Sequence, residues 1–207
     1  MTPSDIQPPP RLILGADPLL NPATGIGHYT RHLLLALYHG NLVSDLKLYA
    51  DGRFLPSEQY LNSVEPPAFH DLTSALTAWQ KIRATLANNR AAVRAYSQIM
   101  PRLGRVRLRR FRDSHLYHSP NFLLPDFEGH TVSTFHDLSI LRFPEFHPIA
   151  RVKFMEKVMR HAAEVGSHII TPTQIVKNEV QDFYGLNSDK VTAIHEGVSD
   201  VFRARGA

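Results

Sequence analysis

A histidine and an aspartate stand together directly after a short stretch that is rich in β-branched residues. The stretch, residues 131–135 (TVSTF), favours a buried strand, and His136 and Asp137 follow it. An imidazole can donate, accept or titrate near neutral pH, and ligands of parallel α/β sheets gather beyond the carboxyl ends of the strands. His136 is therefore a candidate site residue. The alternative, which the sequence leaves open, is that the histidine caps local backbone and that Asp137 is a turn residue.

A second candidate lies near the N-terminus, where Thr24 is followed by Gly25, Ile26, Gly27 and then a helical pattern. Glycine lets the backbone approach a ligand closely, and a helix N-terminus offers unpaired N–H groups that suit an anion or a sugar hydroxyl. The alternative is a tight turn that needs glycine at a positive φ. The spacing lacks the third glycine of a dinucleotide-binding fingerprint and does not by itself indicate a dinucleotide.

Several other chemistries find no support in the sequence. The chain has no cysteine, which excludes thiol catalysis, cysteine zinc sites and disulfides. It contains no Asp-x-Asp, no Walker loop and no serine in a nucleophile elbow. Glu156 and Glu164 both lie in one expected helix, so we interpret them as solvated helix charges and not as a functional acidic pair. His161 and Glu164 alone are too few ligands for a metal site. We therefore expect neither a metal nor a cofactor.

Basic residues are concentrated in one segment. Residues 79–112 contain ten Lys or Arg and no acidic residue, although the formal net charge of the 207-residue chain is only +4. Such a segment is a solvated helix face, a phosphate-binding surface for nucleic acid, or a surface that lies against anionic lipid. The absence of acids favours the two functional interpretations without choosing between them. The candidate surface residues are Arg102, Arg105, Arg107, Arg109 and Arg110.

The first half of the chain reads as a βαβ unit. An apolar strand is expected over residues 11–17, a helix over about 28–39 with Gly40 as its stop, and a second strand over 46–50. Residues 51–70 are expected to be loop, and residues 71–99 a long helix.

The second half alternates strand and helix with short turns. Strands are expected at residues 116–118, 131–135, 168–171 and 191–194, and helices at residues 149–165 and 173–184. This order predicts an α/β fold, a single Rossmann-like domain whose mainly parallel sheet carries helices on both faces. The domain is expected over residues 11–200, after a loose tail at 1–10. The tail lacks the cationic start and apolar stretch of a signal peptide, so we expect a cytoplasmic location.

Three stretches together resemble one large family of glycosyltransferases, the GT-B enzymes called group 1 or family four. Residues 24–37 (TGIGHYTRHLLLAL) resemble the first loop and helix of that family. Residues 135–154 (FHDLSILRFPEFHPIARVKF) resemble its central segment, where a strand ends in His-Asp. Residues 169–202 resemble the segment before the interdomain linker. The resemblance covers most of residues 11–203 except about 51–115.

The resemblance implies roles for individual residues. Gly25, Ile26 and Gly27 correspond to the loop near the donor diphosphate and the transferred sugar. His136 corresponds to the histidine that contacts the transferred sugar, and we place Asp137 beside it in the substrate site.

Two positions depart from the family's usual residues. Thr173 takes the place of the usual serine, and we place it among the substrate-binding residues. Its hydroxyl would also cap the next helix, although Thr171 followed by Pro172 could begin that helix instead. Glu196 stands where an asparagine is common before Gly-Val, which leaves its contact with the linker open.

The resemblance also implies a reaction. It suggests transfer of a hexose-type sugar from a nucleotide sugar to a glycan or lipid-linked acceptor, with retained configuration and no metal. The family's nucleotide-binding second domain would begin after linker residues 201–207, so we expect this chain to be inactive alone. The sequence leaves open whether it is a fragment, a broken reading frame or one half of a split enzyme whose partner is a separate C-terminal domain chain. A role in bacterial surface-polysaccharide synthesis, peripheral on the inner membrane face, would suit the basic segment. The alternatives are a catalytically dead binding domain and a basic nucleic-acid-binding protein.

Overall fold

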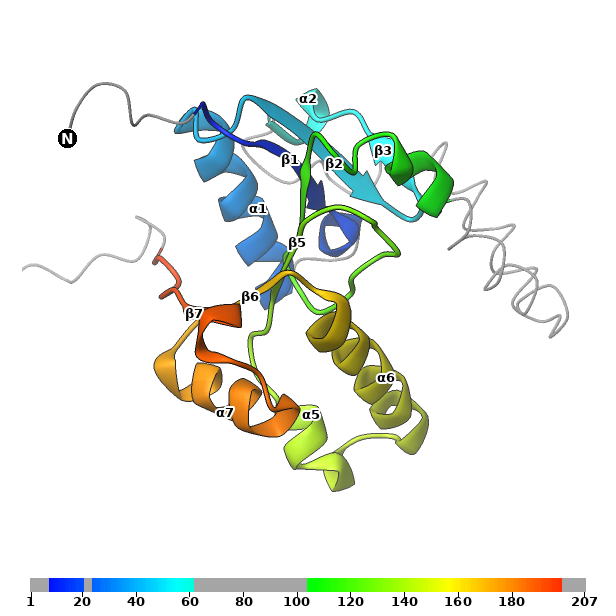
Figure 1. Ribbon diagram of the computed structural model, residues 1–207, viewed down its shortest axis with the longest axis vertical. Coiled ribbons are helices and arrows are strands. Elements are labelled where there is room, and N and C mark those ends of the chain that lie inside the picture. Colours follow the sequence, from blue (N-terminus) through cyan, green and yellow to red (C-terminus); the bar gives the residue numbers. More distant parts are fainter. Residues whose placement is uncertain (1–7, 21–23, 62–103, 199–207) are drawn as a thin grey trace, which may run out of the picture. The chain divides into compact units, whose positions relative to one another are not determined.

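The computed structural model describes residues 8–20, 24–61 and 104–198 of the 207-residue chain. These residues form two compact units (Figure 1). The first unit comprises residues 1–120 and 124–131, and the second comprises residues 121–123 and 132–207. The expected helix at 71–99 lies outside the described residues, as do most of the expected tail and the expected linker at 201–207.

Four strands build the sheet of the first unit, in the order β3-β2-β1-β4. They are β1 (Arg11–Gly15), β2 (Asp45–Ala50), β3 (Arg53–Leu55) and β4 (Leu116–Ser119). β1 pairs in parallel with both β2 and β4, whereas β3 pairs antiparallel with β2. The strands expected at 11–17, 46–50 and 116–118 are therefore present.

The expectation of loop over residues 51–70 is wrong for its first part. β3 follows β2 through a two-residue turn in which Asp51 has φ 48° and Gly52 has φ 76°, and helix α2 (Glu58–Leu61) follows β3. Two successive positive φ angles match the right-handed twist of a hairpin, and Asp-Gly is the dipeptide that favours them. The carboxylate of Asp17 holds this turn by accepting a hydrogen bond from the Asp51 amide at 3.0 Å.

Helix α1 (Gly25–His39) covers the sheet of the first unit and is preceded by the short helix η2 (Asp17–Leu20) (Figure 1). The side chains of Leu14, Leu34 and Leu48 are completely buried in the cluster that joins α1 to β1 and β2. Burying a leucine contributes about 2 kcal/mol, so this cluster anchors α1 against the sheet. The helix ends at Gly40, as the sequence predicts.

The second unit has three parallel strands in the order β5-β6-β7. They are β5 (Thr131–Thr134), β6 (His168–Thr171) and β7 (Val191–Ala193). Because all three strands run the same way, the segments that follow them emerge at one edge of this sheet. The strands expected at 131–135, 168–171 and 191–194 are confirmed.

Helices connect these strands. The expected helices are present as α6 (Ile149–Val165) and α7 (Gln174–Tyr184), while the sequence pattern did not predict the short helices α5 (Ser139–Arg142), η3 (Pro144–Phe146) and η4 (Ser188–Lys190). α7 ends at Gly185, whose φ of 65° is the left-handed conformation that glycine adopts freely.

These observations confirm the predicted fold class: the chain is α/β and Rossmann-like, and all its described strands except β3 pair in parallel. The single-domain boundary at residues 11–200 stays a prediction. In the portions of the chain that are described, no helix has the length and apolar character needed to cross a membrane.

Candidate functional site

His136 lies at the edge of the second unit where its parallel strands end. The residue before it, Phe135, donates its backbone N–H to Ile170 of β6 at 2.8 Å, which fixes where the chain leaves the sheet. The Nδ1 atom of His136 lies 2.8 Å from Oε1 of Glu196, a residue that comes three positions after β7. The imidazole is 18% exposed and the carboxylate 41% exposed. The candidate histidine is thus partly buried and held by an acid from a second strand end.

Asp137 takes part in a turn. Its Oδ1 accepts the backbone N–H of Ser139 at 2.8 Å and the hydroxyl of Ser139 at 2.6 Å. These two hydrogen bonds turn the chain from β5 into α5. Asp137 is therefore a turn residue, as the alternative interpretation of the sequence proposed. The role of Asp137 in the substrate site stays a prediction.

Thr173 caps helix α7. Its Oγ1 accepts the backbone N–H of Val176 at 3.1 Å, which satisfies one of the otherwise unpaired donors of the first turn. A cap of this kind contributes about 1 kcal/mol. The alternative start at Thr171 and Pro172 is wrong, because Thr171 ends β6 and its hydroxyl donates to the Thr173 carbonyl. A contact between Thr173 and substrate stays a prediction.

The glycine pair belongs to the first turn of α1 in the first unit. Thr24 caps the helix by accepting the Gly27 amide on Oγ1 at 3.2 Å, so α1 begins three residues earlier than the expected start at 28. Neither Gly25 nor Gly27 is among the described glycines with a positive φ, so the tight-turn alternative is wrong. A Cβ on Gly27 would lie 3.2 Å from the Pro18 carbonyl oxygen, whereas one on Gly25 would meet nothing within 4 Å. A side chain at Gly27 would thus require the neighbouring backbone of η2 to move slightly.

Gly25, Ile26 and Gly27 lie in one unit and His136 in the other. The shared position beside the transferred sugar that the resemblance implies for them therefore stays a prediction.

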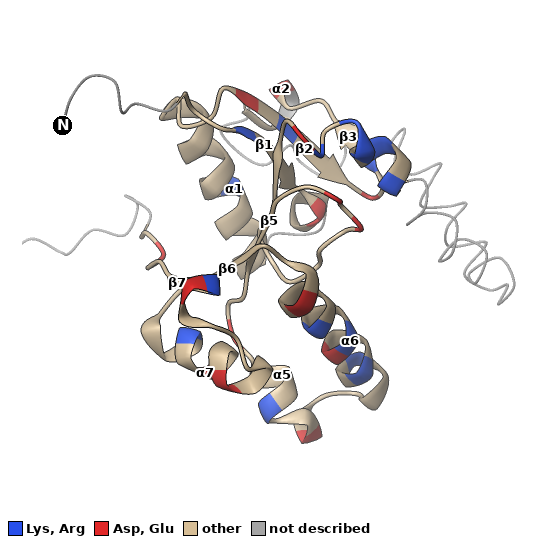
Figure 2. Cartoon of the chain, in the orientation of Figure 1, with Lys and Arg blue, Asp and Glu red and all other residues tan. Residues whose placement is uncertain are grey.

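The basic segment is partly neutralised by acids that follow it in the sequence. Arg105 donates to Glu128 from Nη2 at 2.8 Å and pairs with Asp126 at 3.4 Å, while Arg112 pairs with Asp113 at 3.0 Å. The hydrogen bond from Arg105 holds the pKa of Glu128 below its ordinary value. Figure 2 shows basic and acidic residues side by side in this part of the first unit. A charge count over residues 79–112 alone does not include these acids.

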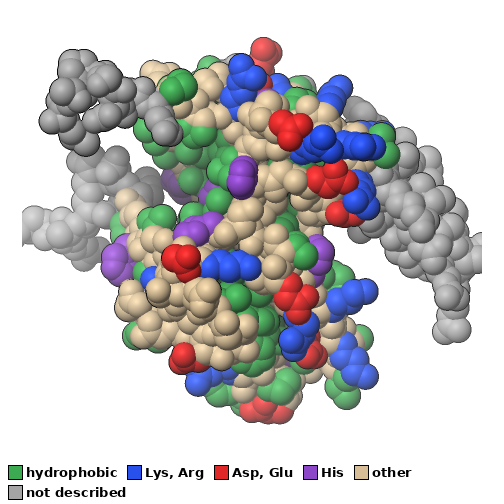
Figure 3. Space-filling model, in the orientation of Figure 1, with side chains coloured by type: hydrophobic (Ala, Val, Ile, Leu, Met, Phe, Trp, Pro, Cys, Tyr) green, Lys and Arg blue, Asp and Glu red, His purple; other side chains and the backbone are tan. Residues whose placement is uncertain are grey.

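The other arginines of the segment have different surroundings. Arg107 donates to the Gly52 carbonyl, and Arg110 stacks over Phe111 at 4.7 Å from the ring centroid. Arg109 is exposed, and Arg102 lies outside the described residues. On the face shown in Figure 3, positive and negative side chains are interspersed. The candidate surface is therefore less uniformly cationic than the sequence suggests.

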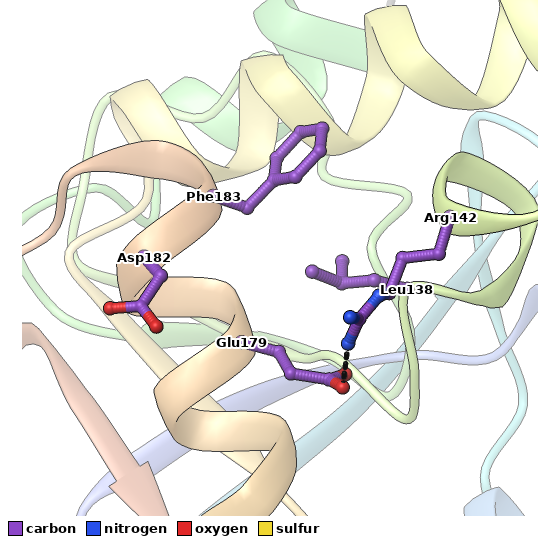
Figure 4. A pocket seen from close by; sticks show the side chains of 5 residues that line it. All are labelled: Leu138, Arg142, Glu179, Asp182 and Phe183. Atoms are coloured by element: carbon purple, nitrogen blue, oxygen red, sulfur yellow. Dashed lines mark hydrogen bonds and ion pairs between the residues drawn. The ribbon is translucent and has the colours of Figure 1, made fainter.

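A surface pocket of about 290 Å³ lies in the second unit between α5 and α7 (Figure 4). Leu138 and Phe183 form apolar walls, and Arg142 pairs with Glu179 across it. Asp182 completes the lining. None of the predicted site residues lines this pocket, although Leu138 follows Asp137 directly.

His118, in β4 of the first unit, is a buried histidine that the sequence did not single out. Its exposed fraction is 7%, and burial lowers its pKa from 6.5 to about 4. Desolvation disfavours the charged imidazolium, so this ring is neutral near pH 7. The short strand LYHS gave no signal that this histidine would be buried near a strand end.

A metal site has no support in the described ranges, since no group of three or more His, Asp or Glu there could hold an ion. The expected absence of a metal and of a cofactor stays a prediction.

Comparison with known proteins agrees with the resemblance. Residues 25–201 match the family described as Glycosyltransferase Family 4. The chain is also similar to the Escherichia coli protein named O-antigen chain mannosyltransferase B, with 29% identity over 181 residues. That alignment covers 87% of this chain and 45% of the relative, so the chain spans less than half the length of that relative. With a mainly parallel α/β fold and a family match from the first turn of α1 to beyond Glu196, the chain belongs to glycosyltransferase family 4, as a domain of the GT-B N-terminal type.

Proposed function

We propose that this chain supplies the acceptor-side half of a retaining glycosyltransferase, which moves a hexose-type sugar from a nucleotide sugar to a glycan or lipid-linked acceptor. The single observation that carries the proposal is the position of His136. It follows a parallel strand at the edge where α/β proteins bind ligands, within a segment that matches the family. Its ring is partly buried and held by Glu196.

Each part of the proposed site would have its own role in the reaction. His136 would contact and orient the transferred sugar, and we do not assign it as a general base. The first turn of α1, with Gly25, Ile26 and Gly27, would lie near the donor diphosphate, where helix N–H groups favour an anion. The remaining stabilisation of the leaving diphosphate would come from cations of a second domain. Preorganised charges and dipoles of this kind commonly contribute more to rate enhancement than any other single effect.

The similarity to a mannosyltransferase of O-antigen chains guides the choice of substrates. We propose a nucleoside diphosphate mannose as the first donor to test and a bacterial surface-polysaccharide precursor as the acceptor.

The test compares the 207-residue protein alone with the same protein joined to, or co-expressed with, the second domain of a family relative. We expect sugar transfer from one member of a nucleotide-sugar panel only when both domains are present, because the cations that would stabilise the leaving diphosphate belong to the second domain in this proposal. Radiolabelled product is measured over time. Turnover by the 207-residue protein alone would contradict the inactivity proposal. Absence of turnover with every sugar and every second domain would favour the alternative of a catalytically dead binding domain.

We also propose that the protein works at an anionic membrane surface, on the cytoplasmic side. Arg109 and Arg110 are exposed and make none of the ion pairs described for Arg105 and Arg112. Replacing Arg109 and Arg110 together with glutamine should weaken binding to anionic liposomes about 30-fold at low salt, since each basic residue near such a surface contributes about 1 kcal/mol and the two together about 2 kcal/mol. Sedimentation with liposomes across a salt series measures it.

The matched control removes the same charge by changing Arg105 and Arg112 to glutamine, and should weaken liposome binding less because Glu128 already neutralises them. No liposome binding at low salt, or equal effects of both double variants, would contradict this proposal. Salt-sensitive binding to nucleic acid but not to liposomes would favour the nucleic-acid alternative instead.

A further inference from the structure

Glu196 reaches His136 across the end of a strand that separates them. β6 lies between β5 and β7. The first residue after each of these two strands still donates a backbone hydrogen bond to β6. Phe135 donates to Ile170 and Ile194 donates to Thr171, each at 2.8 Å. These bonds place the start of each segment on β6, so the approach of the two side chains is set by the sheet register.

The donor and the acceptor of the hydrogen bond between His136 and Glu196 follow from the chemistry of the carboxylate. An ionised carboxylate only accepts hydrogen bonds, so the Nδ1 atom of His136 that lies 2.8 Å from Glu196 carries the proton. In a neutral ring the proton on Nδ1 leaves the lone pair on Nε2. An asparagine at the same position could present either its oxygen or its NH₂ group, and would not by itself select a tautomer.

Burial makes this selection effective. The imidazole is 18% exposed, so its ring has less freedom to reorient than an exposed side chain, and the carboxylate of Glu196 that it contacts is 41% exposed. A partner on one ring nitrogen is the usual means by which proteins fix the tautomer and orientation of a functional histidine.

From this geometry we propose that Glu196 is a positioning residue that holds His136 as its Nδ1–H tautomer and sets the ring plane, so that Nε2 is the nitrogen directed to the transferred sugar. The role rests on the proposed function, in which His136 contacts that sugar. Nε2 then accepts a hydrogen bond from a sugar hydroxyl, which requires a hydroxyl at that position of the donor.

The tautomer is measured directly by long-range ¹H–¹⁵N correlation spectra of the 207-residue protein at pH 8, with His136→Gln used to assign the His136 signals. We expect the wild-type ring to show a protonated Nδ1. Glu196→Ala should shift it toward the Nε2–H form that free imidazole side chains favour, and Glu196→Gln should give a mixture of the two tautomers, because its amide can present either the oxygen or the NH₂ group. Glu164→Gln, which changes an exposed carboxylate of α6 in the same way, is the matched control and should leave the spectrum unchanged.

A second readout uses the two-domain protein. Glu196→Ala should lower kcat/KM about 10-fold, the loss expected for one hydrogen bond, and Glu196→Gln should recover only part of that loss because its amide does not select one tautomer. An Nε2–H ring in the wild-type protein, or a His136 spectrum unaffected by Glu196→Ala, would overturn the assignment. Because the spectra need no substrate, the expected tautomer pattern without sugar transfer would count against the proposed function and not against the Glu196–His136 pairing.

Discussion

Replacing His136 with alanine lowers kcat/KM for sugar transfer by the two-domain protein about 10- to 100-fold. The expected reason is the loss of the hydrogen bond proposed between the imidazole and the transferred sugar, which is worth roughly 1.5–3 kcal/mol when one partner is charged or developing charge. Initial rates over a range of nucleotide-sugar concentrations measure the change.

The variant should remain folded, since the carboxylate that loses its partner is 41% exposed and stays solvated by water. The control is His161→Ala, which removes an exposed imidazole from α6 in the same unit and should leave kcat/KM within about 2-fold of the wild type. Equal activity of His136→Ala and wild type, with both proteins folded, would contradict the role assigned to His136.

The stability of the protein should depend on pH through His118. Burial lowers the folded-state pKa of His118 from 6.5 to about 4, so between these values the unfolded chain binds a proton that the folded chain does not. The free energy of unfolding therefore rises with pH across this window: the contribution is fully present above pH 6.5 and is lost as the pH falls toward 4. Between about pH 7.5 and about pH 5.0 the expected loss is about 2 kcal/mol.

Urea denaturation of wild type and His118→Asn at several pH values between about 5.0 and 7.5 isolates this contribution. The asparagine side chain does not titrate, so the difference in unfolding free energy between the two proteins should shrink by about 2 kcal/mol as the pH falls. His161→Asn, at an exposed position, should retain the wild-type slope. A constant difference between wild type and His118→Asn across this range would show that His118 is not held neutral by burial.

Much of the fold follows from local sequence pattern. The apolar run at the start of β1 and the helical spacing of α6 predicted these elements, and Gly40 and Gly185 end their helices as expected. The hairpin of β2 and β3 was missed although Asp51-Gly52 is a strong hairpin dipeptide, because the prolines at 56, 66 and 67 suggested loop.

The candidate site was only partly predictable. The position of His136 follows from the end of a β-branched strand, but its contact with Glu196 joins residues sixty positions apart and depends on which strand lies between β5 and β7. The pairing of Arg105 with Glu128 similarly depends on the path of residues 113–128, which brings Glu128 back beside Arg105. Charge counts along a sequence cannot include such acids, which explains why the described residues 104–112 form a less strongly cationic surface than the sequence suggests.

The stereochemistry of the product tests most directly whether this chain is half of a retaining glycosyltransferase. The two-domain protein is supplied with an α-linked nucleoside diphosphate mannose that is ¹³C-labelled at C1, and the one-bond C1–H1 coupling of the new linkage is read by NMR. We expect an α-linked product, with the configuration of the donor retained. A β-linked product formed by the enzyme would contradict the proposed retaining reaction.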